Sequence, residues 1–383
     1  MKKSLLALAL GTFALGIAEF STMGLLSQIA SDMNVSISKA GDFISAYAMG
    51  VAIGATSLIL LRKWQMQRTL LLLAAIIAIG NCGVAISQNY WMMMVTRFIA
   101  GLPHGAFFGA GAIVASRIVP PDRGAEAVAL MVGGMNLANL MGVPLITWLG
   151  GLISWRMAYG LSAITGAVAA ISIYRWIPVI EPTSPGSIRS QFGFLRRLAP
   201  WLIIGGTFFG QASVYCWYSY MEPILTQVTG FAMSSMGAIM IVAGAGMTIG
   251  GLAAGRLADK YSSAMIAGIA AATALVCMPC IYIFVHIKWL SLILVFIATA
   301  ALFAIGGPLQ YIIVKFSKGG EMLGGACIQI AFNVSNAVAA AIGGWFIHNN
   351  YGLASPALAG IPFALIACIL LFTLYGRYRK EGA

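Results

Sequence analysis

Long apolar stretches separated by short polar turns run along the whole chain. Each stretch approaches the length of roughly 20 residues that an α-helix needs to cross the hydrocarbon core of a bilayer. The pattern predicts twelve membrane-spanning helices. The first six are expected at Ser4–Ala30, Gly41–Leu61, Thr69–Ser87, Trp91–Ile118, Gly124–Gly151 and Met157–Ile177. The second six are expected at Pro200–Leu225, Ala232–Ala258, Ser262–Val285, Trp289–Val314, Glu321–Ile347 and Ser355–Tyr375.

The composition agrees with a protein embedded in a membrane. Of the 383 residues, 60% are hydrophobic and 8% are charged, whereas soluble domains are about one quarter charged. The mean hydropathy is +0.92, and the predicted helices leave no segment of useful size for a soluble domain. We therefore predict an all-α integral membrane fold of twelve helices, and no enzyme.

The two halves of the chain look like a repeat. Gly11-Thr12-Phe13 in the first predicted helix returns as Gly206-Thr207-Phe208 in the seventh. At nearly the same spacing, the Asn136-x-x-Asn139 pair of the fifth helix returns as Asn333-x-x-Asn336 in the eleventh. Two parallel six-helix halves are the plan of one large class of transporters, whose substrate site lies near the membrane midplane between the halves.

This repeat divides the chain into two bundles and a linker. We expect an N-terminal six-helix bundle over residues 1–177 and a C-terminal six-helix bundle over residues 200–383. Residues 178–199, which are rich in Pro, Gly and Ser, are expected to form a polar cytoplasmic linker. The amphipathic segment Phe192–Leu198 predicts a short helix lying on the membrane surface.

The basic residues predict how the chain is oriented. Most of the 22 lysines and arginines fall in segments that share one side of the membrane when the helices alternate in direction. Because basic loops face the cytoplasm, both termini are expected inside, with the chain in the plasma (inner) membrane. The net charge of +12 therefore reports topology and attraction to anionic lipid, not nucleic-acid binding. The first apolar run resembles a signal peptide, but Glu19 interrupts it, so we interpret it as a retained helix.

Three charged or titratable side chains lie well inside predicted spans, away from the span ends: Glu19, Arg97 and His104. Ionisable groups in the bilayer are costly and usually mark ion or substrate pathways. A buried carboxyl that can hold a proton is what a proton carrier needs, and an imidazole titrates near neutral pH. We predict that Glu19 and His104 carry protons and that Arg97 organises them. The alternatives are a hydrogen-bonded Glu19, a packed His104, and an Arg97 that extends toward the outer interface.

Amide and aromatic side chains with polar tips recur along the predicted helices of both halves. They could line a polar cavity, since such groups suit sugars and flat drugs alike. The alternatives are hydrogen bonds between helices and, for Tyr218, Tyr220 and Glu222, a place in the interfacial belt. The candidate substrate-binding residues are Asn136, Asn139, Gln211, Tyr215, Tyr218, Gln310, Gln329, Asn333 and Asn336.

Several other classes of site are excluded. The six cysteines all fall in apolar stretches, and we interpret them as small buried hydrophobes rather than as metal or redox ligands. The Gly-rich runs lie within predicted helices and lack the Lys-Ser/Thr of a phosphate-binding loop, so the chain alone is not an ATP-driven pump. We predict no cofactor and no metal.

At this point the motifs resemble those of the major facilitator superfamily, and within it the proton-coupled drug and sugar efflux branch. The residues from Gly251 through Gly255, Arg256 and Asp259 resemble the superfamily's loop signature. Arg97 with Gly101 resembles the R-x-x-x-G signature of the fourth helix. The run from Gly133 to Gly142-Val143-Pro144 resembles the antiporter signature of the fifth helix. The matching loop at Leu60–Gln65 lacks the acidic residue on which an Asp-based conformational lock in the N-terminal half would depend.

The closest likeness is to arabinose-efflux-permease-type proteins, over nearly the whole chain. It rests on the Gly16-Ile-Ala-Glu19-Phe20 opening, on Pro103-His104-Gly105 and on Gln329-Ile-Ala-Phe-Asn333. The resemblance implies a proton-coupled antiporter that exports a sugar or drug-like molecule by alternating access. One chain suffices for a transport pathway, so we expect a monomer. It implies conformational roles for Gly142, Pro144, Gly255, Arg256 and Asp259. Two alternatives stay open: a proton-coupled sugar importer of the same fold, and a non-transporting membrane receptor.

Overall fold

Long helices, some of them broken into collinear pieces, make up the molecule. The computed structural model describes residues 2–61, 63–120, 123–180, 192–318 and 320–381. Within these ranges, ten helices are long and apolar enough to cross a membrane. Helices α3 (Ile37–Ala55) and α12 (Leu198–Tyr218) occupy the positions of the predicted second and seventh spans and complete the set of twelve. The prediction of an all-helical fold built from two six-helix halves is confirmed.

The N-terminal half contains the helices of the first six spans. Its elements are α1 (Lys2–Gly24), α2 (Leu26–Asp32), α3, α4 (Ser57–Leu61), α5 (Met66–Ala85), α6 (Tyr90–Gly101), α7 (Pro103–Arg117), α8 (Gly124–Leu137), the π-helix η2 (Ala138–Gly142), α9 (Val143–Leu152) and α10 (Trp155–Trp176).

The C-terminal half repeats this plan with fewer interruptions. Its elements are η3 (Phe192–Arg196), α12, α13 (Met221–Pro223), the π-helix η4 (Ile224–Val228), η5 (Met233–Ser235), α14 (Met236–Lys260), α15 (Ser263–Ile283), α16 (Lys288–Phe316), α17 (Glu321–His348), α18 (Pro356–Tyr378) and η6 (Arg379–Glu381). Where a surface helix is expected at residues 192–198, the structure has the short 3-10 helix η3, with Phe194 buried. The rest of the predicted linker, residues 181–191, lies outside the described residues.

Four predicted spans in the N-terminal half are broken where the apolar pattern is continuous. The first span breaks at Leu25, which leaves helical geometry (φ −128°, ψ 16°) between α1 and α2. The second is interrupted at Thr56, between α3 and α4. The fourth divides into α6 and α7 at Pro103, which has no N–H to continue the helical ladder. The fifth contains η2, which ends two residues before Pro144 and in which a single π-turn absorbs one extra residue.

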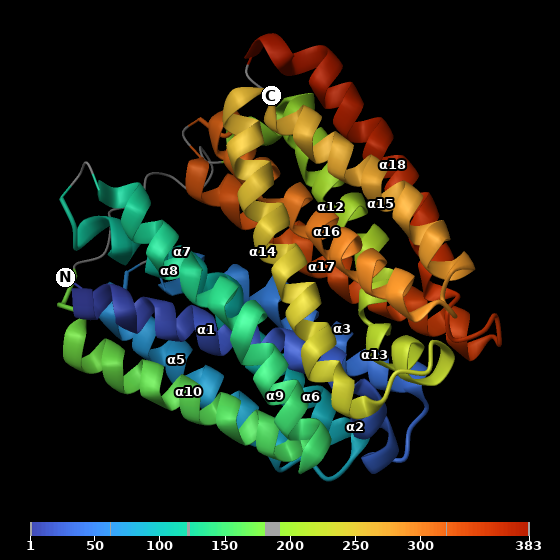
Figure 1. Ribbon diagram of the computed structural model, residues 1–383. Helices are drawn as coiled ribbons and strands as arrows, with labels where there is room; N and C mark the ends of the chain where they lie inside the picture. The colour runs from blue at the N-terminus through green and yellow to red at the C-terminus, as the bar shows by residue number, and fades with distance from the viewer. Residues whose placement is uncertain (1, 62, 121–122, 181–191, 319, 382–383) are drawn as a thin grey trace.

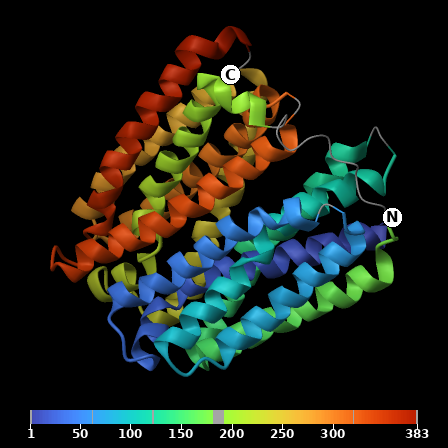
Figure 2. The ribbon, with the colours of Figure 1, turned by 180° about the vertical axis from the view of Figure 1, so that it is seen from behind.

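The two halves meet at one end of the molecule and diverge toward the end that carries both termini (Figure 1). The view from behind shows the same arrangement (Figure 2). We name these the closed end and the open end. The packing agrees: one hydrophobic core joins both halves at the closed end, whereas a second core lies within the N-terminal half and a third within the C-terminal half.

Two pairs of helices carry most of the contact between the halves. Helix α14 packs against η2 and α9, and α17 packs against α3. Small residues permit this approach: a Cβ placed on Gly244 of α14 would clash with the Asn139 carbonyl oxygen of η2. Hydrogen bonds also cross from α3 to α17, from Ser38 Oγ to the Gly344 carbonyl at 2.6 Å and from Ser45 Oγ to the Ala337 carbonyl at 2.8 Å.

Candidate functional site

A cavity of about 960 Å³ lies between the two halves. It opens at the open end, where Arg117 and Phe192 are among its lining residues, and it reaches Glu19 and Phe20 of α1 at its deep end. Most of the lining is apolar, with aromatic rings and methionines from both halves. Examples are Phe108, Met131, Met135, Phe303 and Phe332. Such a cavity has room for a small organic molecule and can surround its apolar surface.

Glu19 and His104 face one another in the wall of this cavity. Glu19 comes from α1 and is 3% exposed, while His104 comes from the first turn of α7 and is 5% exposed. Their nearest atoms, Glu19 Oε2 and His104 Nε2, are 3.8 Å apart. The His104 ring also stacks on Phe108, with ring centroids 5.4 Å apart. The structure thus brings together the two groups that the sequence singled out as titratable.

Arg97 lies behind this pair and is fully buried. Its Nε donates to the Phe43 carbonyl oxygen at 3.2 Å and its Nη1 to the Ala18 carbonyl oxygen at 2.7 Å. Its guanidinium also lies over the Tyr47 ring, 4.3 Å from the centroid, where a cation–π attraction holds it. The alternative in which Arg97 extends to the interface is wrong, because the side chain is enclosed by α1, α3 and α6.

Tyr47 of α3 is the residue of this cluster that sequence reasoning did not identify. Its hydroxyl lies 3.0 Å from His104 Nδ1, and its ring supports Arg97. Helix α3 packs closely on α6 beside Tyr47, since a Cβ placed on Gly101 would clash with the Tyr47 carbonyl oxygen. One tyrosine in an apolar stretch carries no signal that it lies beside the histidine, since the contact depends on how two helices cross.

Two polar atoms in this cluster are left without a hydrogen-bond partner among the described residues. They are Glu19 Oε1 and Arg97 Nη2, and both are buried. Because an unpaired buried polar atom is costly, both atoms have unused capacity for water, solute or a rearranged contact. The Glu19 carboxylate and the His104 imidazole line the cavity and can take up and release protons, with the Arg97 guanidinium fixed behind them.

The predicted substrate-binding residues divide into two groups. Gln211, Gln310, Gln329 and Asn333, all from the C-terminal half, line the cavity. Two of them also make hydrogen bonds to backbone carbonyls, from Gln211 to Leu302 at 3.1 Å and from Asn333 to Gln329 at 2.9 Å. The residues that lie outside the cavity lining in this conformation are Asn136, Asn139, Tyr215, Tyr218 and Asn336.

The predicted tyrosines of this second group form an aromatic layer next to the deep end of the cavity. Tyr215 packs edge-on against Phe332, with centroids 5.6 Å apart, and Tyr218 packs edge-on against Phe20 at 6.2 Å. Both tyrosines are buried. Contrary to the expectation from the sequence, Tyr215 and Tyr218 therefore do not line the cavity in this conformation but form part of the barrier between the cavity and the closed end.

Glu222 links the two halves at the closed end. Its side chain is fully buried, and its Oε2 accepts a hydrogen bond at 2.7 Å from the backbone N–H of Ser27 in α2. Tyr220 is also buried and donates from its hydroxyl to the Ala340 carbonyl at 2.7 Å. The alternative that Tyr218, Tyr220 and Glu222 belong to an interfacial belt is wrong, because all three are enclosed between helices.

The residues with implied conformational roles lie at two places. Gly142 ends η2 and packs against Phe13 and Ile17 of α1, and Pro144 lies in the first turn of α9, so both border the contact with α14. The second place is the last two turns of α14, where Gly255, Arg256 and Asp259 are exposed. In the described part of the chain, Arg256 and Asp259 take part in no ion pair.

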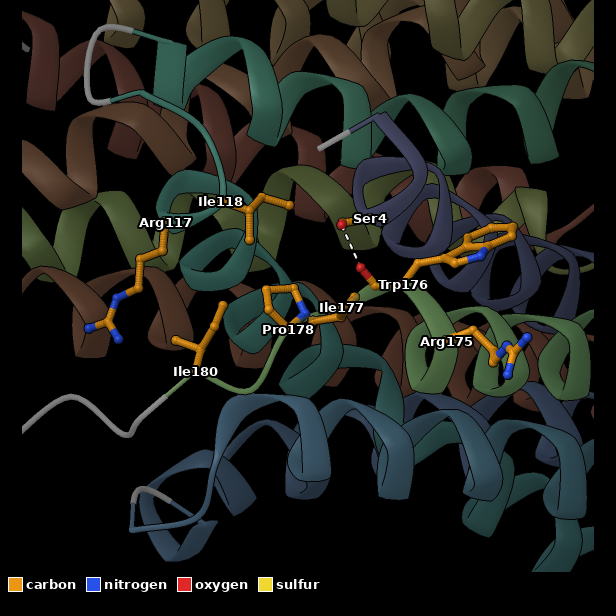
Figure 3. Close-up of a pocket in the computed structure, with 8 residues that line it drawn as sticks. All are labelled: Ser4, Arg117, Ile118, Arg175, Trp176, Ile177, Pro178 and Ile180. Carbon is orange, nitrogen blue, oxygen red and sulfur yellow. Dashed lines mark hydrogen bonds between the residues drawn. The ribbon is translucent and has the colours of Figure 1, made fainter.

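A second, open hollow of about 430 Å³ lies at the open end of the N-terminal half (Figure 3). Ser4 Oγ donates to the Trp176 carbonyl oxygen at 2.6 Å on its wall. Figure 3 shows that Arg117 and Arg175 lie on opposite sides and extend away from one another, so the two cations do not converge on one ligand. Among the described residues, no cluster of three His, Cys, Asp or Glu side chains could hold a metal ion.

Comparisons with known proteins agree with this arrangement. AraJ of Escherichia coli (strain K12) is 42% identical, over 100% of this chain and 97% of that protein. The inner membrane transport protein YdhP of Escherichia coli (strain K12) is 35% identical, over 96% of this chain and 95% of that protein. A protein of Helicobacter pylori (strain ATCC 700392 / 26695) described as a probable sugar efflux transporter is 25% identical, over 97% and 95%.

The similarity in fold to solved structures and the match to a family model indicate the same protein family. A crystal structure of a bacterial homolog to the human lysosomal transporter Spinster, in an inward-facing and unoccupied conformation, superposes with a TM-score of 0.77 at 14% identity, covering 99% of this chain and 98% of that one. Residues 8–324 match the model of the Major Facilitator Superfamily. With twelve helices in two halves around a central cavity, this chain belongs to the major facilitator superfamily and is a membrane transporter rather than an enzyme.

Proposed function

We propose that this chain is a proton-coupled secondary transporter that exports a small organic solute in exchange for protons. The observation that carries the proposal is the Glu19–His104 pair, 3.8 Å apart, in the wall of the cavity between the two halves. A proton and a solute that enter this cavity therefore reach the same few residues. Competition for one cavity is the simplest way to couple two fluxes in opposite directions.

The charges of the cluster support that competition. Arg97 stays protonated at any working pH, so the net charge of the cluster depends on Glu19 and His104. With Glu19 charged and His104 neutral, the cluster is neutral overall, and one bound proton makes it positive. That proton opposes the entry of a cationic solute, and it removes hydrogen-bond acceptor capacity that a neutral solute could use.

The lining of the cavity supports a solute with an apolar body and a few hydrogen-bonding groups. Phe20, Phe108, Phe303 and Phe332 offer apolar surface, while the four amides of the C-terminal half offer donors and acceptors. The 25% identical relative described as a probable sugar efflux transporter supports a sugar as one candidate. The mostly apolar lining supports a drug-like molecule as the other.

The way the halves pack supports alternating access. We propose that residues 1–177 and 200–383 rock as two bodies, joined by a linker at residues 178–199. The closed end would then open as α14 and α17 separate from α9 and α3, and the open end would close. The basic residues favour an orientation with both termini on the cytoplasmic side, so the open end would be the cytoplasmic one. Because the cavity lies between the two halves of one chain, a single chain would suffice for transport.

The first experiment finds a solute and then tests coupling. Purified protein is screened by thermal shift at two pH values against pentoses, hexoses, tetraphenylphosphonium and neutral aromatic drugs. The best ligand is then added to proteoliposomes, and proton movement is recorded with a pH-sensitive dye. We expect solute-driven proton movement in the unaltered protein and its loss in Glu19→Gln and His104→Asn.

Matched controls use the same changes far from the cavity. Glu381→Gln alters an exposed carboxylate that pairs with Arg197, and His348→Asn alters an exposed histidine. Both controls are expected to retain coupling. Full coupling in both Glu19→Gln and His104→Asn would contradict the proposal, and solute accumulation driven by an inward proton gradient would contradict export. Labelling of cysteines introduced at Lys3 and Asn350 with an impermeant maleimide tests the orientation.

A further inference from the structure

Tyr47 has two possible acceptors for one hydroxyl hydrogen. Its oxygen lies 3.0 Å from His104 Nδ1 and 3.5 Å from the Leu15 carbonyl oxygen. The hydroxyl can donate to only one of them at a time, but its oxygen can also accept. The choice between the two acceptors is therefore tied to the hydrogen that His104 itself carries.

The neutral imidazole has one N–H and one bare nitrogen. The 3.0 Å contact with Nδ1 fits a hydrogen bond in either direction. Donation from Tyr47 to Nδ1 is favoured because a phenol hydroxyl is a better donor than acceptor and a bare imidazole nitrogen is a good acceptor, and this leaves the ring hydrogen on Nε2. Nε2 is the nitrogen that faces Glu19 Oε2. In this arrangement Nδ1 accepts from Tyr47, and the N–H at Nε2 is directed at the Glu19 carboxylate.

The doubly protonated imidazole can keep its hydrogen bond to Tyr47 without movement of any heavy atom. The added proton resides on Nδ1, which then donates to the Tyr47 oxygen. The Tyr47 hydrogen turns about its C–O bond toward the Leu15 carbonyl, and no proton leaves Tyr47. Loss of the added proton to water in the cavity reverses these steps, so the hydrogens balance in both directions.

We propose that Tyr47 is a positioning residue that fixes the neutral His104 with its hydrogen on Nε2, directed at Glu19, and that keeps a hydrogen bond to the ring when it takes up a second proton. This inference rests on the proposed function in so far as His104 handles the coupled proton. It goes further by assigning the hydrogen to a nitrogen.

The surroundings hold Tyr47 and His104 in register. Arg97 of α6 lies over the Tyr47 ring, and Phe108 stacks on the His104 ring. The charged and titratable groups around the pair are Glu19 of α1, Arg97 of α6 and, beyond Arg97, Tyr159 of α10. The Tyr159 hydroxyl forms a hydrogen bond with the Thr22 hydroxyl instead, with 2.5 Å between the two oxygens.

Nitrogen NMR of ¹⁵N-histidine-labelled protein tests the assignment directly. The chain has three histidines, and the exposed His286 and His348 are removed by Asn substitution to assign His104. At a pH at which the His104 ring is neutral, its spectrum is expected to show the Nε2–H tautomer in excess. A dominant Nδ1–H tautomer in this protein, whose His104 site is unaltered, would overturn the proposal.

A pair of variants then isolates the hydroxyl. Tyr47→Phe keeps the ring beneath Arg97 and removes the oxygen. The ratio of the Nε2–H to the Nδ1–H tautomer is expected to fall, by at most roughly 12-fold, the effect of one whole neutral hydrogen bond, because the hydroxyl also accepts weakly from Nδ1–H. Tyr159→Phe removes the other tyrosine hydroxyl near Arg97 and is expected to leave the ratio unchanged. Equal ratios in Tyr47→Phe and in the unaltered site, or an equal shift in Tyr159→Phe, would refute the role. The readout needs no transport, so it stays separate from a failure of coupling in liposomes.

Discussion

Replacing Glu222 with Ala is expected to loosen the closed end. Its carboxylate, from the C-terminal half, accepts the Ser27 N–H of the N-terminal half at 2.7 Å. Leu25, the residue that precedes α2, offers no side-chain cap, so within the described residues Ser27 N–H relies on Glu222. Gln227 Nε2 adds a weaker contact to Ser27 Oγ at 3.3 Å. These contacts form only while the two halves are together at this end.

The size of the effect follows from the chemistry of the bond. A hydrogen bond to a charged group contributes about 1.5–3 kcal/mol. If that energy is lost from the closed form alone, the ratio of closed to open molecules falls by roughly 10- to 150-fold. Glu222→Gln keeps an acceptor oxygen without the charge. It is therefore expected to shift the ratio by less than Glu222→Ala, because bonds between neutral groups are about half as strong.

Distances between spin labels measure this ratio. Labels are attached at Gln88 and His286, two exposed positions at the closed end of opposite halves, in a variant whose six cysteines are replaced. We expect a longer distance to gain population in Glu222→Ala, and less so in Glu222→Gln. The reasoning is refuted if Glu222→Ala gives the same distance distribution as the parent, or if Gln and Ala shift it equally.

Three further predictions concern stability and opening. Gly101→Ala is expected to lower the free energy of unfolding by about 1–3 kcal/mol, because its Cβ would clash with the Tyr47 carbonyl, whereas Gly133→Ala, which meets no atom, should leave thermal unfolding unchanged. Tyr220→Phe, which loses its bond to the Ala340 carbonyl, is expected to cost about 1 kcal/mol; an unchanged melting temperature would contradict this. Asp259→Asn is expected to change unfolding by less than about 0.5 kcal/mol, since its side chain is exposed, yet to slow transport; equal rates would dismiss a conformational role.

The sequence predicts the spans and the paired polar groups because both follow from the cost of polar atoms in lipid. Charged side chains in membrane-spanning helices face the bundle interior or a watery cavity and pair with one another, so Glu19, Arg97 and His104 could be expected to lie close together. The contact with Tyr47 could not be foreseen, because it depends on the crossing of α3 with α6 and α7.

The asparagine pairs show where the repeat stops being informative. Asn333 and Asn336 lie in the continuous helix α17, and Asn333 lines the cavity. Their counterparts Asn136 and Asn139 fall on either side of the α8–η2 junction. A π-turn holds one extra residue and so rotates the residues after it relative to a continuous α-helix. Matching sequence positions therefore do not give matching directions, and the bulge leaves no mark in an apolar pattern.

The division of polar groups between the two halves has a consequence for how specificity can change. Glu19, Tyr47, Arg97 and His104 all belong to the N-terminal half, whereas the cavity-lining amides Gln211, Gln310, Gln329 and Asn333 all belong to the C-terminal half. A rocking motion preserves the distances within each half and alters those between them. Under the proposed function, the groups that handle the proton would therefore keep their mutual distances while the contacts to the solute form and break. Under that proposal, substitutions among the amides would alter which solutes are accepted while the contacts among Glu19, Tyr47, Arg97 and His104 stay in place, so the C-terminal half could diversify more freely than the N-terminal half.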